Sequence, residues 1–147
     1  MTPKRSIVAL VAATLLLGCG PVPGGALRGK VTPPPPQWSE TLQGERAICE
    51  IESRPEAPHS IQLECFAYEG GLYVQSHRWA LAPWWPVQSW AAIWLEHPDV
   101  RVRVDDEIFE LEAVRVADGP QRSAILQQRG YDPVPPGIVL FRFEPRS

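Results

Sequence analysis

Ser76, His77 and Arg78 are the consecutive side chains whose types best suit ligand binding. They follow the alternating run LYVQ, so we expect them at the end of a strand. There an anion would receive charge-assisted hydrogen bonds from the Arg78 guanidinium, with the Ser76 hydroxyl beside it. The chain has no recognisable nucleophile–base pair, and its three histidines lack the spacing of metal ligands. If the protein binds an anion, Arg78 is therefore the residue expected to contact it, and the sequence predicts no metal site.

Cys19 is the residue with the clearest modification chemistry. Lys4 and Arg5 precede an apolar run over residues 7–17, which is too short to span a bilayer but has the length of a secretory signal. The sequence LLGC that ends at Cys19 resembles the bacterial lipobox. That resemblance implies cleavage before the cysteine, lipidation of its thiol, and, because Gly20 follows, sorting to an outer membrane. The alternative is an ordinary signal peptide with a chance cysteine.

The sequence predicts three segments of different character. Residues 1–18 are the lipoprotein signal peptide, residues 19–43 are the lipidated cysteine with a Pro/Gly-rich tether, and residues 44–147 are the folded domain. Removal of residues 1–18 leaves 129 of the 147 residues, with 12 basic and 17 acidic side chains and a formal charge of −5. Nucleic-acid binding is not expected, since it needs a concentrated basic face. We expect a cell-envelope protein held to the membrane by diacylglycerol and palmitate, facing the periplasm.

Cys49 and Cys65 lie on the apolar faces of two adjacent alternating runs, RAICEIES and HSIQLECFA. A hairpin centred on Ala57 would place Cys49 directly opposite Cys65 and every other inward apolar residue opposite another. Since Cys19 is used by the lipid, this even pair predicts a structural disulfide in an exported protein. Free buried thiols and a redox or metal role are the alternatives.

Six runs of period two predict six short strands, joined by short links. A Trp-rich helix is expected from Pro86 to His97, and a late helix from an Asp118/Gln121 capping box to Gly130. This order predicts a mainly β (α+β) fold, a small antiparallel barrel with two helices. The strand runs are RAICEIES, HSIQLECFA, LYVQS, VRVRV, IFELEAVRV and GIVLFRFEP.

The stretch from Glu50 to Glu144 resembles the split β-barrel proteins related to pyridoxamine-phosphate oxidase. The carrying motifs are EGGLYVQS, SWAAIWLEHPDVRVRVDDEIFELEAVRV and GIVLFRFEP, over roughly two thirds of the chain. The nearest group by these motifs is the deazaflavin-dependent nitroreductases and quinone reductases. The resemblance implies a six-stranded antiparallel split β-barrel with a central Trp-rich helix. This sequence departs from that group at SRPEAPHS, where members that bind deazaflavin tend to carry a Lys-Ser-Gly-x-x-Arg stretch.

Two functions follow from this resemblance. In the first, the protein is a flavin- or deazaflavin-dependent oxidoreductase in which Arg54, Ser76, His77 and Arg78 hold phosphate and Trp90 walls the ring. A haem-binding barrel that uses one histidine is a further option.

In the second, the barrel has lost the cofactor and binds an apolar small molecule, a lipid or an envelope protein through WALAPWWPVQSW. For each side chain named, ordinary surface exposure or core packing is the alternative role. A homodimer is left open.

Overall fold

The computed structural model describes residues 24–84 and 88–147. Its elements, in chain order, are β1 (Lys30–Val31), α1 (Trp38–Thr41), β2 (Arg46–Ser53), β3 (His59–Tyr68), β4 (Gly71–Gln75), α2 (Trp90–Glu96), β5 (Asp99–Val104), β6 (Glu107–Arg115), α3 (Pro120–Gln128) and β7 (Leu140–Pro145). The six predicted strands are confirmed as β2 to β7. The predicted signal segment and Cys19 lie outside the described residues.

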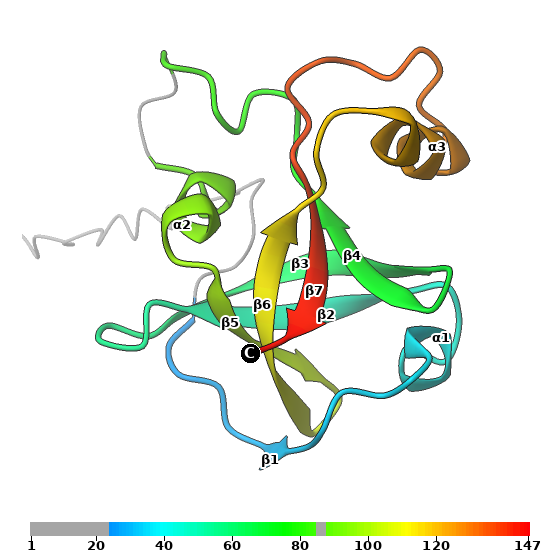
Figure 1. Cartoon of the computed structure of the whole chain (residues 1–147). Coiled ribbons are helices and arrows are strands. Elements are labelled where there is room, and N and C mark those ends of the chain that lie inside the picture. The colour runs from blue at the N-terminus through cyan, green and yellow to red at the C-terminus, as the bar shows by residue number, and fades with distance from the viewer. Residues whose placement is uncertain (1–23, 85–87) are drawn as a thin grey trace, which may run out of the picture.

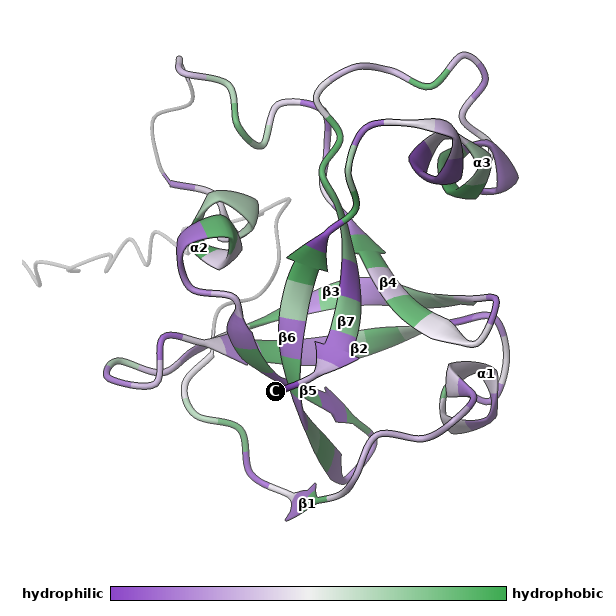
Figure 2. Ribbon diagram, in the orientation of Figure 1, coloured by the Kyte–Doolittle hydropathy of each residue, from purple (hydrophilic) through white to green (hydrophobic). Residues whose placement is uncertain are grey.

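Strands β2 to β7 form a closed, six-stranded antiparallel barrel. The order around it is β6-β5-β2-β3-β4-β7, and pairing of β6 with β7 completes the circle. The alternation of apolar and polar residues that predicted the strands is visible along β6 in Figure 2. A closed barrel leaves none of these strands with an unpaired edge. The predicted fold class, mainly β with short helices, is confirmed.

The barrel interior holds the main core. Trp94 of α2 is 1% exposed and packs on Phe141 and Phe143 of β7, with ring centroids 5.4 and 5.8 Å apart. Trp38 of α1 enters the same core and meets the Phe109 ring edge-on at 4.8 Å. In Figure 1 these two helices lie on opposite sides of the barrel. Each therefore contributes one large ring to the same interior.

Helix α3 covers the outside of the barrel rather than its interior. Ile125 and Leu126 are fully buried against Phe66 and Tyr73, which point outward from β3 and β4. The chain then returns over Ile138 to enter β7. In Figure 1, β4 and β6 end, and β7 begins, at the end of the barrel nearest α3. This arrangement brings three loops together at one end of the molecule.

The two helices predicted from the sequence are α2 and α3, and their first residues differ from the predicted ones. Helix α2 begins at Trp90, and the N-cap is Ser89, whose Oγ accepts a hydrogen bond from the Ala92 N–H at 3.2 Å. The predicted start at Pro86 lies outside the described residues. Helix α3 has Gly119 as N-cap without a side-chain bond, so the predicted Asp118/Gln121 capping box is wrong. Asp118 instead lies 3.5 Å from the Arg122 guanidinium, one turn further on.

The described part of the predicted tether, residues 24–43, lies against the barrel. Gly24 pairs with Ser60, Leu27 is 8% exposed, and β1 runs parallel to β6. Trp38, near the end of this segment, is buried in the core. The Pro/Gly composition gave no sign of these contacts, since they depend on barrel residues far away in the sequence.

Candidate functional site

A cavity of about 230 Å³ lies where β4 and β6 end and β7 begins. Three arginines from three separate segments line it, together with apolar residues of two loops. Asp118 is the one acidic residue in this lining. The lining residues are Arg78, Leu81, Ala82, Arg115, Asp118, Arg122, Gly137, Ile138 and Val139. The predicted anion-binding residue Arg78 is therefore at a cavity, together with two arginines that the sequence analysis did not select.

Arg78 is exposed, and its guanidinium carbon lies 4.2 Å from the centroid of the Trp79 ring. Stacking of this kind uses the flat face of the guanidinium and leaves the N–H groups in its plane available. The Arg78 side chain makes no ion pair within the described ranges. Its position suits an anion that approaches from the cavity.

Arg115 and Arg122 complete the positive lining. Arg115 is the last residue of β6, is exposed, and has no ion-pair partner among the described residues. Arg122, in the first turn of α3, is 9% exposed and donates a hydrogen bond to the Ile138 carbonyl oxygen at 2.5 Å. That bond fixes Arg122 against the wall of the cavity, whereas Arg115 lines it as an exposed side chain.

The backbone of Gly137 lies close to that of Arg78. Its φ of +87° is in the region that favours glycine, and a Cβ there would overlap the carbonyl oxygen of Arg78. Only a residue without a side chain allows this approach, which connects the position of Arg78 to the entry into β7.

Ser76 has a structural role at the same end of the barrel. It is 3% exposed, its Oγ donates to the His77 carbonyl oxygen at 2.9 Å, and it accepts from the Val139 N–H at 2.8 Å. These bonds tie the end of β4 to the start of β7. The hydroxyl therefore positions the loop of Arg78. His77 is exposed, and its Nδ1 accepts a hydrogen bond from the Trp79 N–H at 3.1 Å.

Arg54 and Trp90 do not line the cavity that Arg78 lines. Arg54 lies in the turn between β2 and β3, with a positive φ of +58° and a buried Nε atom that has no hydrogen-bond partner. Trp90 is half-buried and packs on Trp94, with ring centroids 4.6 Å apart, and on Phe141 at 6.1 Å. Trp90 therefore packs against the main core.

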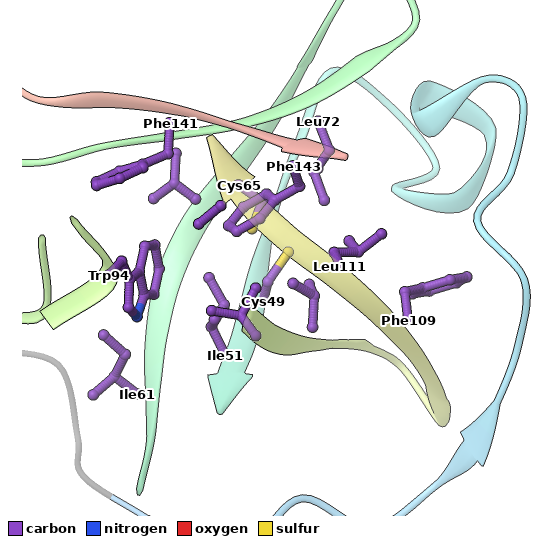
Figure 3. Close-up of a cluster of buried hydrophobic side chains, with 14 of the residues drawn as sticks. Cys49, Ile51, Ile61, Cys65, Leu72, Trp94, Phe109, Leu111, Phe141 and Phe143 are labelled. Atoms are coloured by element: carbon purple, nitrogen blue, oxygen red, sulfur yellow. The ribbon is translucent and has the colours of Figure 1, made fainter. Parts of the chain in front are cut away.

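Cys49 and Cys65 are free, fully buried thiols inside the barrel, close to one another in Figure 3. The predicted register is wrong by two residues, because Cys49 lies opposite Leu63 and Cys65 opposite Ala47. A shift of two keeps both side chains on the same face, so the predicted inward set is still inward. Burial, together with a hydrogen bond to Cys49, raises the pKa of the Cys65 thiol well above its ordinary value. A disulfide between the two stays a prediction.

The loop between β4 and α2 carries the exposed tryptophans. We call residues 77–84 the aromatic loop. Trp79 is 42% exposed and Trp84 is 63% exposed, and their ring centroids lie 5.5 Å apart. Leu81 of the same loop is 39% exposed. Of the described tryptophans, the loop pair faces solvent while Trp38 and Trp94 are core residues.

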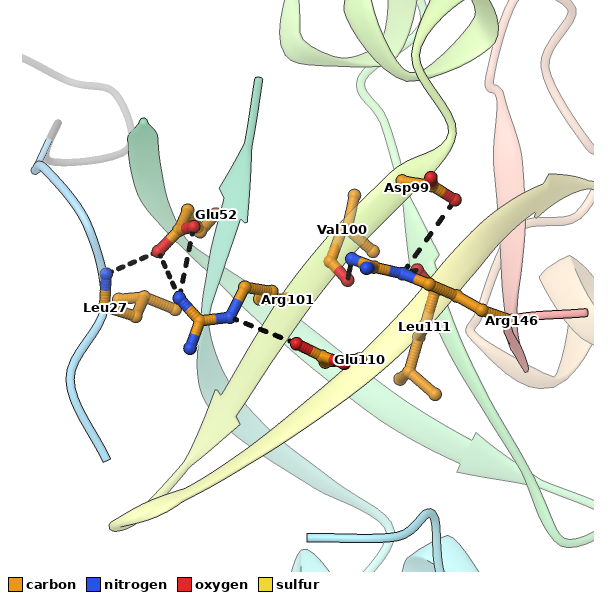
Figure 4. A network of polar contacts seen from close by, with 8 residues as sticks. All are labelled: Leu27, Glu52, Asp99, Val100, Arg101, Glu110, Leu111 and Arg146. Atoms are coloured by element: carbon orange, nitrogen blue, oxygen red, sulfur yellow. Dashed lines mark hydrogen bonds and ion pairs between the residues drawn. The ribbon is translucent and has the colours of Figure 1, made fainter. Parts of the chain in front are cut away.

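A second group of charges lies on the barrel wall, in Figure 4. Glu52 is 6% exposed, accepts a hydrogen bond from the Leu27 N–H at 2.5 Å and pairs with Arg101 at 3.3 Å. Arg101 also faces Glu110, with 3.9 Å between the paired atoms. On the same wall, Arg103 pairs with Glu50. These wall arginines are neutralised by neighbouring carboxylates.

Arg115 and Arg122 are the cavity residues that sequence reasoning missed. Arg115 did carry a signal, because the inward series Phe109, Leu111 and Ala113 continues to it at the same period. A charge at the last inward position of a strand indicates the open end of a barrel. Arg122 had no such signal, since its place depends on how α3 packs.

Among the described residues, no helix is both long and apolar enough to cross a membrane. No protein-family model matches the chain, and no curated protein matches it.

Proposed function

We propose that this is a lipid-anchored protein of the bacterial cell envelope whose barrel binds the apolar part of a lipid through its aromatic loop. The proposal combines the lipobox-like sequence at Cys19 with the exposed rings of Trp79 and Trp84. Localisation at the outer membrane, facing the periplasm, is part of it. The protein acts as a binding module in this proposal.

The observation that carries the proposal is the exposure of two adjoining indole rings beside Leu81. Indole is favoured at the boundary between water and lipid, because its ring is apolar and its N–H is polar. Trp38 and Trp94 of the same chain are almost completely buried, so exposure of the indole ring is a property of the loop and not of every tryptophan. A loop that exposes Trp79 and Trp84 suits contact with an apolar ligand.

An N-terminal lipid would strengthen this contact by raising the effective concentration of the loop near a bilayer. A second weak contact is effective when the first already tethers the molecule. The aromatic loop therefore needs only a modest affinity of its own. The membrane is the partner in this arrangement.

The test places the lipidated protein in vesicles that contain phosphatidylcholine with brominated acyl chains. Bromine quenches the fluorescence of tryptophans that reach the acyl region. We expect a quenched component in the wild type that disappears in a Trp79→Phe/Trp84→Phe variant. A Trp90→Phe variant, which changes a half-buried ring on α2, is the matched control and should keep that component. Equal quenching in all three proteins would contradict the proposal, as would no quenching in any.

A second function, a split-barrel flavin or deazaflavin reductase related to pyridoxamine-phosphate oxidase, has one observation in its favour. Arg78 lines a cavity with Arg115 and Arg122, where the phosphate of a cofactor would find three guanidinium groups. The separate positions of Arg54 and Trp90 do not add to this support. Titration of FMN with the protein tests it: quenching of flavin fluorescence at micromolar protein, lost in Arg78→Ala and kept in Arg46→Ala, would favour the reductase over the binding module.

A further inference from the structure

We propose that the cavity lined by Arg78, Arg115 and Arg122 binds the phosphate monoester headgroup of an anionic lipid whose apolar part contacts the aromatic loop. This inference rests on the proposed function and names the class of its ligand. The cavity and the loop are continuous, since Arg78 and Leu81 belong to both.

The charge of the lining supports a doubly charged group. The lining includes three guanidiniums and one carboxylate, that of Asp118, so its side chains carry a formal charge of +2. A phosphate monoester near neutral pH carries about −1.5 to −2. Asp118 is 79% exposed at its side chain and lies 3.5 Å from Arg122, so it neutralises one guanidinium weakly. Arg78 and Arg115 remain for the ligand.

The arrangement of the donors also suits phosphate better than carboxylate. The arginines come from three segments: the loop after β4, the end of β6 and the first turn of α3. A planar carboxylate is satisfied by one arginine fork, whereas a tetrahedral phosphate accepts hydrogen bonds from several directions. With about 230 Å³, the cavity has room for a headgroup, and the acyl chains would lie outside it.

Two contacts prepare Arg78 for binding before any ligand arrives. Its guanidinium is stacked on Trp79, and its backbone is held close to Gly137. A side chain held in its binding conformation loses less entropy when the ligand binds. Trp79 would thus have two roles, one toward the arginine and one toward the apolar part of the lipid.

The experiment uses the lipidated full chain in nonionic detergent and measures binding by isothermal titration calorimetry. The probes are inorganic phosphate, short-chain phosphatidic acid in mixed micelles, and phosphatidylcholine of the same chain length. We expect phosphatidic acid to bind more tightly than either of the others. Arg78→Ala and Arg115→Ala should each weaken its affinity about tenfold or more, the change expected when a charged hydrogen bond is lost. Arg46→Ala, which removes an exposed charge on β2, should change it less than twofold.

The outcomes separate the cavity from the aromatic loop. Phosphatidic acid binding no better than phosphatidylcholine, together with no binding of phosphate, would overturn the proposal. Equal loss in Arg78→Ala and Arg46→Ala would also overturn it, because the effect would then be one of net charge.

Binding of inorganic phosphate that depends on Arg78, without any gain from the acyl chains, would keep the phosphate site but refute the lipid and with it the proposed function. A Trp79→Phe/Trp84→Phe variant that lowers affinity for phosphatidic acid but not for phosphate would support both the headgroup site in the cavity and the contact of the acyl chains with the aromatic loop. Unchanged unfolding temperatures of the variants confirm that they fold.

Discussion

The arginines of the barrel wall and those of the cavity differ in how their charge is matched. On the wall, strand register places Arg101 opposite Glu52 and Glu110, and Arg103 opposite Glu50. At the cavity, Arg115 is opposite Phe141, and Arg78 lies in a loop without any cross-strand neighbour. Pairing of strands supplies a carboxylate to each wall arginine, whereas the cavity has Asp118 alone among its lining residues. The comparison teaches that the same residue type stabilises the barrel in one region and is available for a ligand in the other.

The largest effect is expected from Glu52→Ala on the wall. This substitution leaves the half-buried Arg101 guanidinium and the Leu27 N–H without their shared acceptor. Loss of both hydrogen bonds, one of which leaves the buried Leu27 N–H unsatisfied, is expected to lower the free energy of unfolding by about 3 kcal/mol. Urea denaturation measures it. Glu110→Ala, at a carboxylate that is 49% exposed, is the control and should cost about 0.5 kcal/mol. Equal losses in the two variants would show that the wall network is not organised around Glu52.

A smaller effect is expected from Gly137→Ala at the cavity. The strained backbone and the overlap with the Arg78 carbonyl oxygen should lower the free energy of unfolding by about 2 kcal/mol. Because the Arg78 loop must move, phosphate binding should weaken in the same variant. Gly25→Ala is the control, since no atom lies within 4 Å of a Cβ at that position. Gly137→Ala with wild-type stability would mean that the close approach is not needed.

The comparison is tested most directly by Arg101→Ala against Arg78→Ala. Arg101→Ala leaves the buried carboxylate of Glu52 with the Leu27 N–H as its remaining partner and should lower the free energy of unfolding by about 1.5 kcal/mol. Arg78→Ala should change it by less than about 0.5 kcal/mol, as exposed substitutions usually do. Thermal and urea unfolding provide both values. Phosphate binding should show the reverse order, with Arg78→Ala weakening it more than Arg101→Ala. If Arg78→Ala proved the more destabilising of the two, the division between wall and cavity would be wrong.

The smallest effect concerns the thiols inside the barrel. The pKa of Cys65 is raised by burial, so in the folded state the thiol keeps its proton at pH values where the unfolded chain loses it. Stability of the reduced protein should therefore be unaffected below the ordinary value of 9.0 and fall above it, by at most about 1.4 kcal/mol per pH unit. Urea unfolding between pH 8 and 10 measures this slope.

An oxidised sample provides the control for the thiols. If Cys49 and Cys65 form the predicted disulfide in the native compartment, the protein isolated from it should lack this slope. Its intact mass should also stay unchanged on alkylation without reductant. Two alkylated thiols after unfolding would contradict the disulfide.

Much of the barrel could be predicted from local pattern. The run VRVRV, with Arg101 and Arg103 on one face, is β5 with its valines buried. The β2–β3 hairpin was predicted with the correct faces, but its register was displaced by two residues. The alternation of side chains repeats every two residues and so cannot distinguish registers that differ by two. Turn geometry, with Arg54 at positive φ, decides between them.

The candidate site could be predicted only in part. Arg78 was selected as a residue just past a strand end, and in the structure it lines a cavity. Ser76 was selected for its hydroxyl, whose hydrogen bonds instead join two loops. Arg54 and Trp90 were grouped with Arg78 through the resemblance, and they do not line the cavity that Arg78 lines. Residues of three different segments meet at this site, and the order of the segments along the chain does not tell which side chains meet.

By itself, the sequence determined the strands, their inward faces and the class of fold, because these depend on the period of neighbouring residues. It also carries the lipobox-like signal at Cys19, which is a local chemical pattern. Closure of β6 on β7 was decided by the tertiary structure, as were the docking of residues 24–43 and the meeting of Arg78, Arg115 and Arg122. These features depend on contacts between residues distant along the chain. Burial and charge pairing that exist only once the barrel is formed stabilise the closure and the docking of residues 24–43, and the elements that carry the three arginines then bring them together.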